Sequence, residues 1–96
     1  MRYLYKKRFL DAFDALSHDD QALARAADRA IREYHRTRRA PYGLRMKKLH
    51  ASGEGVLFEA RLSLSLRILW AEGPGQASFL LLGSHDELRR VLKRLA

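Results

Sequence analysis

The stretch VLFEARLSLSLRILW, residues 56–70, alternates apolar and polar side chains with a period of two. Successive side chains of a strand point to opposite faces of a sheet, so this period is typical of half-buried strands. The apolar face would carry Phe58, Ala60, Leu62, Leu66, Ile68 and Trp70, and the other face would carry Glu59, Arg61 and Arg67. The pattern therefore predicts two strands joined by a turn, with one common apolar face.

The turn between these strands must hold an odd number of residues, because a register slip of one residue moves every side chain to the opposite face. Ser63-Leu64-Ser65 satisfies this condition, although a three-residue turn usually contains a glycine and this one has none. The register then places Arg61 opposite Arg67, with Cβ atoms about 5 Å apart, which destabilises a sheet unless a negative group lies nearby. We therefore expect an anion-binding site here.

The composition limits the class of protein. The chain has 96 residues, 47% of them hydrophobic, no cysteine and a net charge of +8. This size suits one domain, residues 1–96, and the charge favours nucleic acid, an anionic surface or an acidic protein as partner. No apolar run approaches the roughly 20 residues that span a bilayer, so we expect no membrane association. The missing cysteines agree with a reducing cytoplasm, where we expect the protein to act.

Two helices are predicted before the central stretch. Apolar residues recur at helical spacing over residues 7–16, and Ser17 is a suitable N-cap for a second helix that ends near Arg38. Residues 40–43, APYG, then break the pattern. A short strand over residues 2–6 precedes both helices, at an edge of the sheet.

Further strands are predicted at residues 44–50 and 77–83, with turns at residues 52–55 and 73–76. The continuous apolar run ASFLLLG suits a strand buried on both faces, and Ser84 and Glu87 match the capping box of a C-terminal helix. We therefore expect an α+β fold, in which a short N-terminal strand and a two-helix hairpin precede a mainly antiparallel sheet of four to five strands in total, followed by a short C-terminal helix.

Several polar residues lie on the predicted strands or at the start of the predicted C-terminal helix. In a sheet with this order of elements, their side chains can come together on one surface. They are Lys47, Lys48, Glu59, Arg61, Arg67 and His85, with His50 as a weaker candidate. Each has an ordinary structural alternative; Glu59, for example, lies diagonally from Arg67 and can form an ion pair with it. The four histidines lack the spacing of a zinc site, so we expect no metal and no cofactor.

Cleavage of an RNA backbone without a metal needs a base for the 2′-hydroxyl proton, cations for the phosphoryl oxygens and an acid for the leaving oxygen. Arginines and lysines can supply the cations, and His85 can serve as the acid because histidine titrates near neutral pH. Glu59 or a lysine can act as the base, and the sequence does not decide between them.

Four segments, GLRMKKL at 43–49, FEARL at 58–62, LRILW at 66–70 and LGSHDEL at 82–88, together resemble the RelE/ParE toxin superfamily in order and spacing. The resemblance implies a microbial-ribonuclease-like fold and a toxin that is encoded with an acidic antitoxin. RelE-like members are metal-independent endoribonucleases that cleave mRNA on the ribosome.

The resemblance also implies roles for particular residues. Lys47 or Lys48 would hold and polarise the RNA, Arg61 would bind the scissile phosphate, and His85 would match the late basic or histidine residue of several members. Basic residues of the family also anchor it to mRNA and ribosomal RNA, which here makes candidates of Arg45, Arg67, Arg89 and Arg90.

Two alternatives remain open. Arg89 and Arg90 stand where many members with a similar ending have a tyrosine. ParE-like members lack the nuclease residues and inhibit DNA gyrase, so one alternative is a non-enzymatic gyrase inhibitor. The other is a basic RNA-binding module without toxicity.

Overall fold

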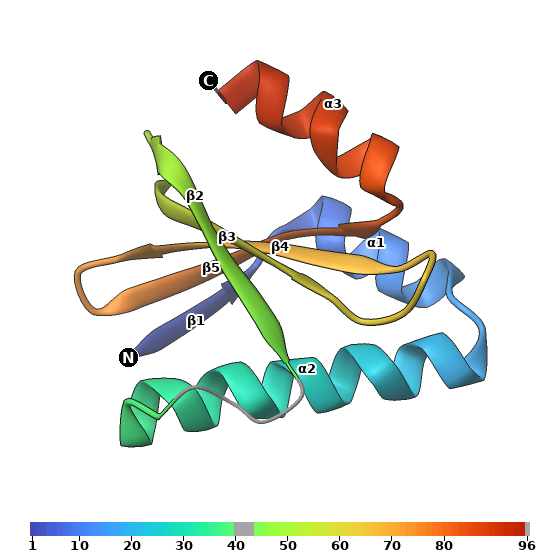
Figure 1. Cartoon of the computed structure of the whole chain (residues 1–96), viewed down its shortest axis with the longest axis horizontal. Coiled ribbons are helices and arrows are strands. Elements are labelled where there is room, and N and C mark those ends of the chain that lie inside the picture. Colours follow the sequence, from blue (N-terminus) through green and yellow to red (C-terminus); the bar gives the residue numbers. More distant parts are fainter. Residues whose placement is uncertain (40–43, 96) are drawn as a thin grey trace.

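A computed structural model describes residues 1–39 and 44–95, which form a five-stranded sheet and three helices (Figure 1). The strands are β1 (Arg2–Tyr5), β2 (Arg45–Ser52), β3 (Gly55–Arg61), β4 (Arg67–Gly73) and β5 (Gln76–Gly83). The helices are α1 (Lys7–Ala15), α2 (His18–Thr37) and α3 (His85–Leu95). The predicted break at residues 40–43 lies outside the described residues. The elements otherwise follow the predicted order, and the α+β class is confirmed.

The strands lie in the order β1-β5-β4-β3-β2. The pairs β2–β3, β3–β4 and β4–β5 are antiparallel, because short turns join consecutive strands, whereas β1 pairs with β5 in parallel after the chain has passed through α1 and α2. We predicted that the N-terminal strand lies at an edge of the sheet and that the strands of the second half of the chain are antiparallel. Both predictions are confirmed.

The first core lies between the sheet and the pair α1 and α2. Its sheet side contains the predicted apolar set of β3 and β4, and Trp70 is fully buried there. Helix α2 contributes Ala24, Ala27 and Ile31 to this core. Leu23 is 38% exposed, because the helix face that meets the sheet carries Ala24 and the residues three and seven positions after it.

The second core lies on the opposite face, under α3. Figure 1 shows α2 and α3 on opposite sides of the sheet. Leu88 of α3 is fully buried against a cluster that includes Leu57, Leu69 and Leu81. Because helices cover both faces, six of the eight residues of β5 are buried, as the apolar run predicted.

The predicted capping box holds the start of α3. The Glu87 carboxylate accepts a hydrogen bond from the Ser84 amide at 2.9 Å, and the Ser84 hydroxyl accepts one from the Glu87 amide at 3.2 Å. The hydrogen bonds from Ser84 lower the pKa of Glu87 below its usual value. The direction of α3, and with it the position of its first residue, His85, is fixed by these contacts.

A buried polar network joins α2 to β1 and β4. His35 Nε2 lies 2.7 Å from Glu72 Oε2, and His35 Nδ1 lies 2.9 Å from the Tyr3 hydroxyl. The indole of Trp70 donates to the same Glu72 oxygen at 2.9 Å. The side chain of His35 is only 3% exposed, so this histidine supports the fold.

Candidate functional site

Three arginines lie side by side across three neighbouring strands. Arg45 of β2 pairs with Arg61 of β3, and Arg61 pairs with Arg67 of β4. Arg67 in turn pairs with Gly83, the last residue of β5, two residues before His85. Side chains at paired positions share a face, so the Cβ atoms of the three arginines form a row at one end of the sheet on the face that α3 covers, and the Arg61 side chain also lines a hollow with Leu23 and Ala27 of α2. The predicted opposition of Arg61 and Arg67 is confirmed.

The turn that makes this register possible depends on Ser63. Its hydroxyl accepts hydrogen bonds from the amides of Ser65 at 3.3 Å and Leu66 at 3.1 Å. No residue of the turn has a positive φ, so the missing glycine is replaced by a serine side chain that closes the chain on itself. The Ser63 carbonyl also accepts a hydrogen bond from Arg61 Nε at 3.3 Å.

Arg67 has the negative partner that the like-charge pair requires. Its guanidinium lies 3.4 Å from Glu59 Oε1, and the two side chains are 24% and 11% exposed. Glu59 lies diagonally from Arg67 in the register, as we expected for an ion pair. Lys47 pairs with Glu59 from the other side, so this carboxylate stands between two cations. Of its two predicted roles, the structure shows the ion pair.

Arg45 and Arg61 differ from Arg67, because neither forms an ion pair with a described carboxylate. Both are exposed and line a hollow of about 310 Å³, whose other walls are Leu62, Ser63 and Leu64. No acidic side chain of residues 1–39 or 44–95 lines this hollow. It therefore combines two uncompensated guanidinium groups, which can bind a phosphate through several N–H donors, with an apolar wall.

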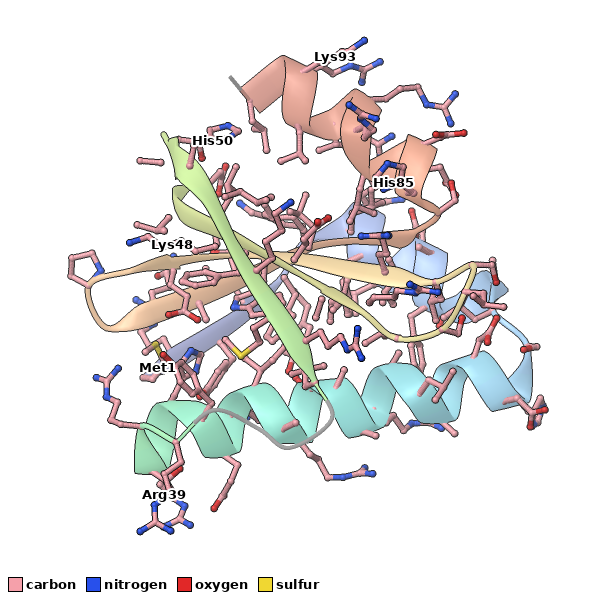
Figure 2. The ribbon with its side chains drawn as sticks, viewed as in Figure 1. Met1, Arg39, Lys48, His50, His85 and Lys93 are labelled. Atoms are coloured by element: carbon pink, nitrogen blue, oxygen red, sulfur yellow. The ribbon has the colours of Figure 1, made fainter. Side chains whose placement is uncertain are left out.

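His85 lies at the same end of the sheet as these arginines, and Lys47 lies on the same face as Arg45. His85 is exposed at the start of α3, just beyond the strand end that pairs with Arg67. Figure 2 shows His85 at this helix start and His50 near the far end of β2, so the two histidines do not belong to one site. Lys47 is exposed and points to the same face as the neighbouring Arg45, two residues away along β2.

Lys48, Arg89 and Arg90 lie elsewhere. Lys48 pairs with Phe58, whose side chain packs in the first core, so Lys48 points to the face opposite the arginine row. Arg89 and Arg90 are exposed on α3, where they line a hollow of about 340 Å³ together with Asp86 and Lys93. These two arginines form a second basic surface, which we distinguish from the row at the strand ends.

Comparison with known proteins identifies the fold. No protein-family model and no curated protein matches the sequence. Among solved structures, a copper-bound mutant toxin from Helicobacter pylori superposes with a TM-score of 0.68 at 16% identity, over 92% of this chain and 98% of that one. A YoeB/ParE toxin from Agrobacterium tumefaciens gives 0.64 at 18% identity, over 88% and 99%. The RelB-RelE antitoxin-toxin complex from Methanococcus jannaschii gives 0.63 at 12% identity, over 92% and 96%. The chain has the RelE/ParE toxin fold.

Within this RelE/ParE fold, two features of the site were not predicted from the sequence. Ser63 was assigned only to the turn, yet its side chain closes the turn and its carbonyl holds Arg61. Arg45 was a candidate without a stated position, and the β2–β3 register now places it beside Arg61. The absence of glycine between two strands with clear alternation was the one signal in the sequence that pointed to Ser63.

The described residues were also compared with the requirements of membrane-spanning helices and metal sites. None of the described helices combines the length and the apolar composition needed to cross a bilayer. Within residues 1–39 and 44–95, no three histidine, aspartate or glutamate side chains are grouped to hold a metal ion together.

Proposed function

We propose that this chain is the toxin of a toxin-antitoxin system and a metal-independent endoribonuclease that cleaves mRNA on the ribosome. The observation that carries the proposal is the hollow at the strand ends, where Arg45 and Arg61 lack a partner among the described carboxylates while Arg67 has one. The RelE/ParE fold supports it, since the similar structures are toxins. A site that leaves two adjacent guanidinium groups uncompensated is suited to a polyanion.

The proposed chemistry assigns one role to each of four candidate side chains. Arg61, with Arg45 beside it, binds the scissile phosphate and stabilises the charge that builds on its oxygens. The 2′-oxygen attacks phosphorus as its proton passes to a base, and the bond to the 5′-oxygen breaks as that oxygen takes a proton from the acid. His85 is the proposed acid, and Lys47 is the proposed base because it shares the face of the row.

Glu59 and Lys48 have no role in proton transfer in this proposal. Glu59 is 9% exposed and bound to Arg67, so we assign it to support of the row. Lys48 points to the other face and is assigned to contacts with RNA or ribosomal RNA outside the reacting group. Arg67, Arg89 and Arg90 complete the proposed RNA-binding set.

The proposed partners follow from charge. A net charge of +8 on 96 residues attracts mRNA and ribosomal RNA, and it also attracts an acidic antitoxin that would neutralise the toxin by covering its basic surface. One of the similar structures is itself an antitoxin-toxin complex. We place this activity in the cytoplasm, where messages and ribosomes are found.

A ParE-like inhibitor of DNA gyrase is the second candidate. The observation that favours it is the shortage of proton carriers beside Arg61, because Glu59 is held in an ion pair and Lys48 faces away. One of the similar structures is a YoeB/ParE toxin. In this alternative the arginine row would bind a protein surface without any cleavage.

Induction in cells tests the two candidates together. Wild type, Arg61→Ala and His85→Ala are compared with Arg36→Ala, a control that removes an arginine from an exposed position of α2. Mapping of mRNA 5′ ends on ribosomes should show cleavage by wild type and by the control, and a loss of at least about 10²-fold in the two site variants. Unchanged cleavage in both site variants contradicts the assignment. Intact messages with stalled replication would establish the gyrase alternative.

A further inference from the structure

The most exposed large apolar side chain of the described residues is Leu64, at the tip of the turn between β3 and β4. It is 91% exposed, against 52% for Met1 and 47% for Leu10. A leucine in this position adds nothing to either core, since it contacts mainly water. The turn that carries it is nevertheless ordered by the two hydrogen bonds to the Ser63 hydroxyl. An apolar side chain is thus presented on a defined support.

Leu64 stands beside the two uncompensated arginines. It lines the same hollow as Arg45 and Arg61, together with Leu62. The volume of about 310 Å³ lies at the small end of the range for ligand sites, which is roughly 300–1,000 Å³. One wall therefore attracts an anion, and the adjoining wall offers an apolar contact.

We propose that this hollow is a subsite for one nucleotide of single-stranded RNA, with the phosphate on Arg45 and Arg61 and the base against Leu64. The inference rests on the proposed function, because it assumes that RNA is the ligand. A nucleotide carries an anion and a flat apolar surface in immediate succession, which matches the two walls. Bases in a duplex are stacked and present only their edges, so contact with a protruding leucine selects an unpaired base.

The hydrogen bond from Arg61 to the Ser63 carbonyl links the two halves of the subsite. It uses the Nε–H of Arg61 and leaves the N–H groups of both terminal nitrogens for a phosphate. The same residue that orders the turn under Leu64 thereby orients Arg61. The distance between the phosphate contact and the base contact is set by one turn, so Leu64 is a specificity-determining residue for the nucleotide next to the bound phosphate.

Binding to labelled RNA oligonucleotides tests this subsite directly. The probe is a fluorescein-labelled single-stranded RNA, compared with an oligonucleotide of the same length in which every base is absent, and affinity is measured by anisotropy. Leu64→Ala should weaken binding of the ordinary RNA about fivefold, because part of one leucine side chain leaves contact with the base. It should leave the affinity for the abasic oligonucleotide and the salt dependence of binding unchanged, since no charge is lost.

Two control variants separate loss of the base contact from general effects of a substitution and from loss of charge. Leu10→Ala removes another exposed leucine, from α1, which contributes no residue to the lining of the hollow, and should leave RNA binding unchanged. Arg61→Ala should weaken binding of both oligonucleotides and reduce the slope of log affinity against log salt by about 0.7.

The outcomes separate the subsite from the proposed function. Unchanged RNA affinity in Leu64→Ala, or equal weakening for ordinary and abasic RNA, overturns the subsite even where wild type cleaves mRNA. Base-dependent weakening in a protein that binds RNA without cutting it supports the subsite and refutes the nuclease. A wild type that lacks affinity for RNA and binds an acidic protein through Leu64 instead overturns both.

Discussion

Replacing Glu59 with glutamine separates the two roles open to this carboxylate, support of Arg67 and general base for RNA cleavage. The substitution keeps the size of the side chain and removes its charge, so Arg67 loses its partner and faces Arg61 alone. Removing one partner of a buried ion pair costs about 3–5 kcal/mol, and removing an exposed one about 0–1 kcal/mol. With side chains 11% and 24% exposed and 3.4 Å between the charged atoms, the pair lies between these limits.

We therefore expect Glu59→Gln to lower the free energy of unfolding by about 2 kcal/mol, which corresponds to roughly 10 °C in Tm for a domain of this size. Urea unfolding followed by circular dichroism measures the change. The double variant with Arg67→Gln should be more stable than the sum of the two single changes predicts, by about 1 kcal/mol or more, because the repulsion between the arginines is also removed.

Single-turnover cleavage of mRNA on ribosomes provides the functional arm of the same experiment. If Glu59 only supports Arg67, cleavage at a temperature where the variant is folded should stay within about tenfold of wild type, since removal of a general base usually costs about 10²–10⁴-fold. A loss beyond about 10²-fold in a variant of unchanged stability would make Glu59 the base and refute our assignment.

Three further predictions concern the surroundings of the site. Lys47→Ala should slow single-turnover cleavage by about 10²-fold or more, because it removes the proposed base, whereas Lys48→Ala, which removes a proposed RNA contact, should reduce the slope of log affinity against log salt by about 0.7, as anisotropy measures. Ser63→Ala should lower the free energy of unfolding by about 1 kcal/mol and weaken RNA binding, and Ser63→Thr, which keeps the hydroxyl, should restore both; equal effects of the two variants would contradict the role of the turn. Glu87 has a pKa below its usual value of 4.5, so its stabilisation is present above that value and is lost as the pH falls through the folded-state pKa. Glu87→Gln should therefore cost about 1 kcal/mol or less at neutral pH and flatten the acid limb of a stability curve, while Ser84→Ala gives the matched loss of the cap.

The central hairpin was predictable because two independent constraints act on the same residues. Period-two alternation indicated which side chains of β3 and β4 share a face, and parity restricted the turn to an odd number of residues. The shortest suitable turn, Ser63-Leu64-Ser65, then predicted the pairing of Arg61 with Arg67 without any tertiary information. The capping box at Ser84 was equally local, because its hydrogen bonds join residues three apart. Local rules of this kind need no knowledge of the rest of the chain.

Other features depended on contacts between distant segments. The register of β2 follows a loose alternation and shifts between Lys48 and Ala51, so the sequence did not reveal that Arg45 lies beside Arg61. His35 belongs to the basic run HRTRR, residues 35–39, at the end of α2, and only the approach of β1 and β4 makes it a buried member of a polar network. A histidine among arginines carries no local sign of burial.

The difference between Arg61 and Arg67 explains how the site and the stable sheet are compatible. Two arginines at paired positions repel each other, and a carboxylate for each would abolish both the repulsion and any affinity for a phosphate. Here Arg67 is given a full counter-charge by Glu59, while Arg61 is held by a neutral acceptor, the carbonyl of Ser63. A neutral acceptor orients a guanidinium without cancelling its charge. The affinity for an anion is therefore concentrated at Arg61 and its neighbour Arg45, next to the turn on which Leu64 is exposed.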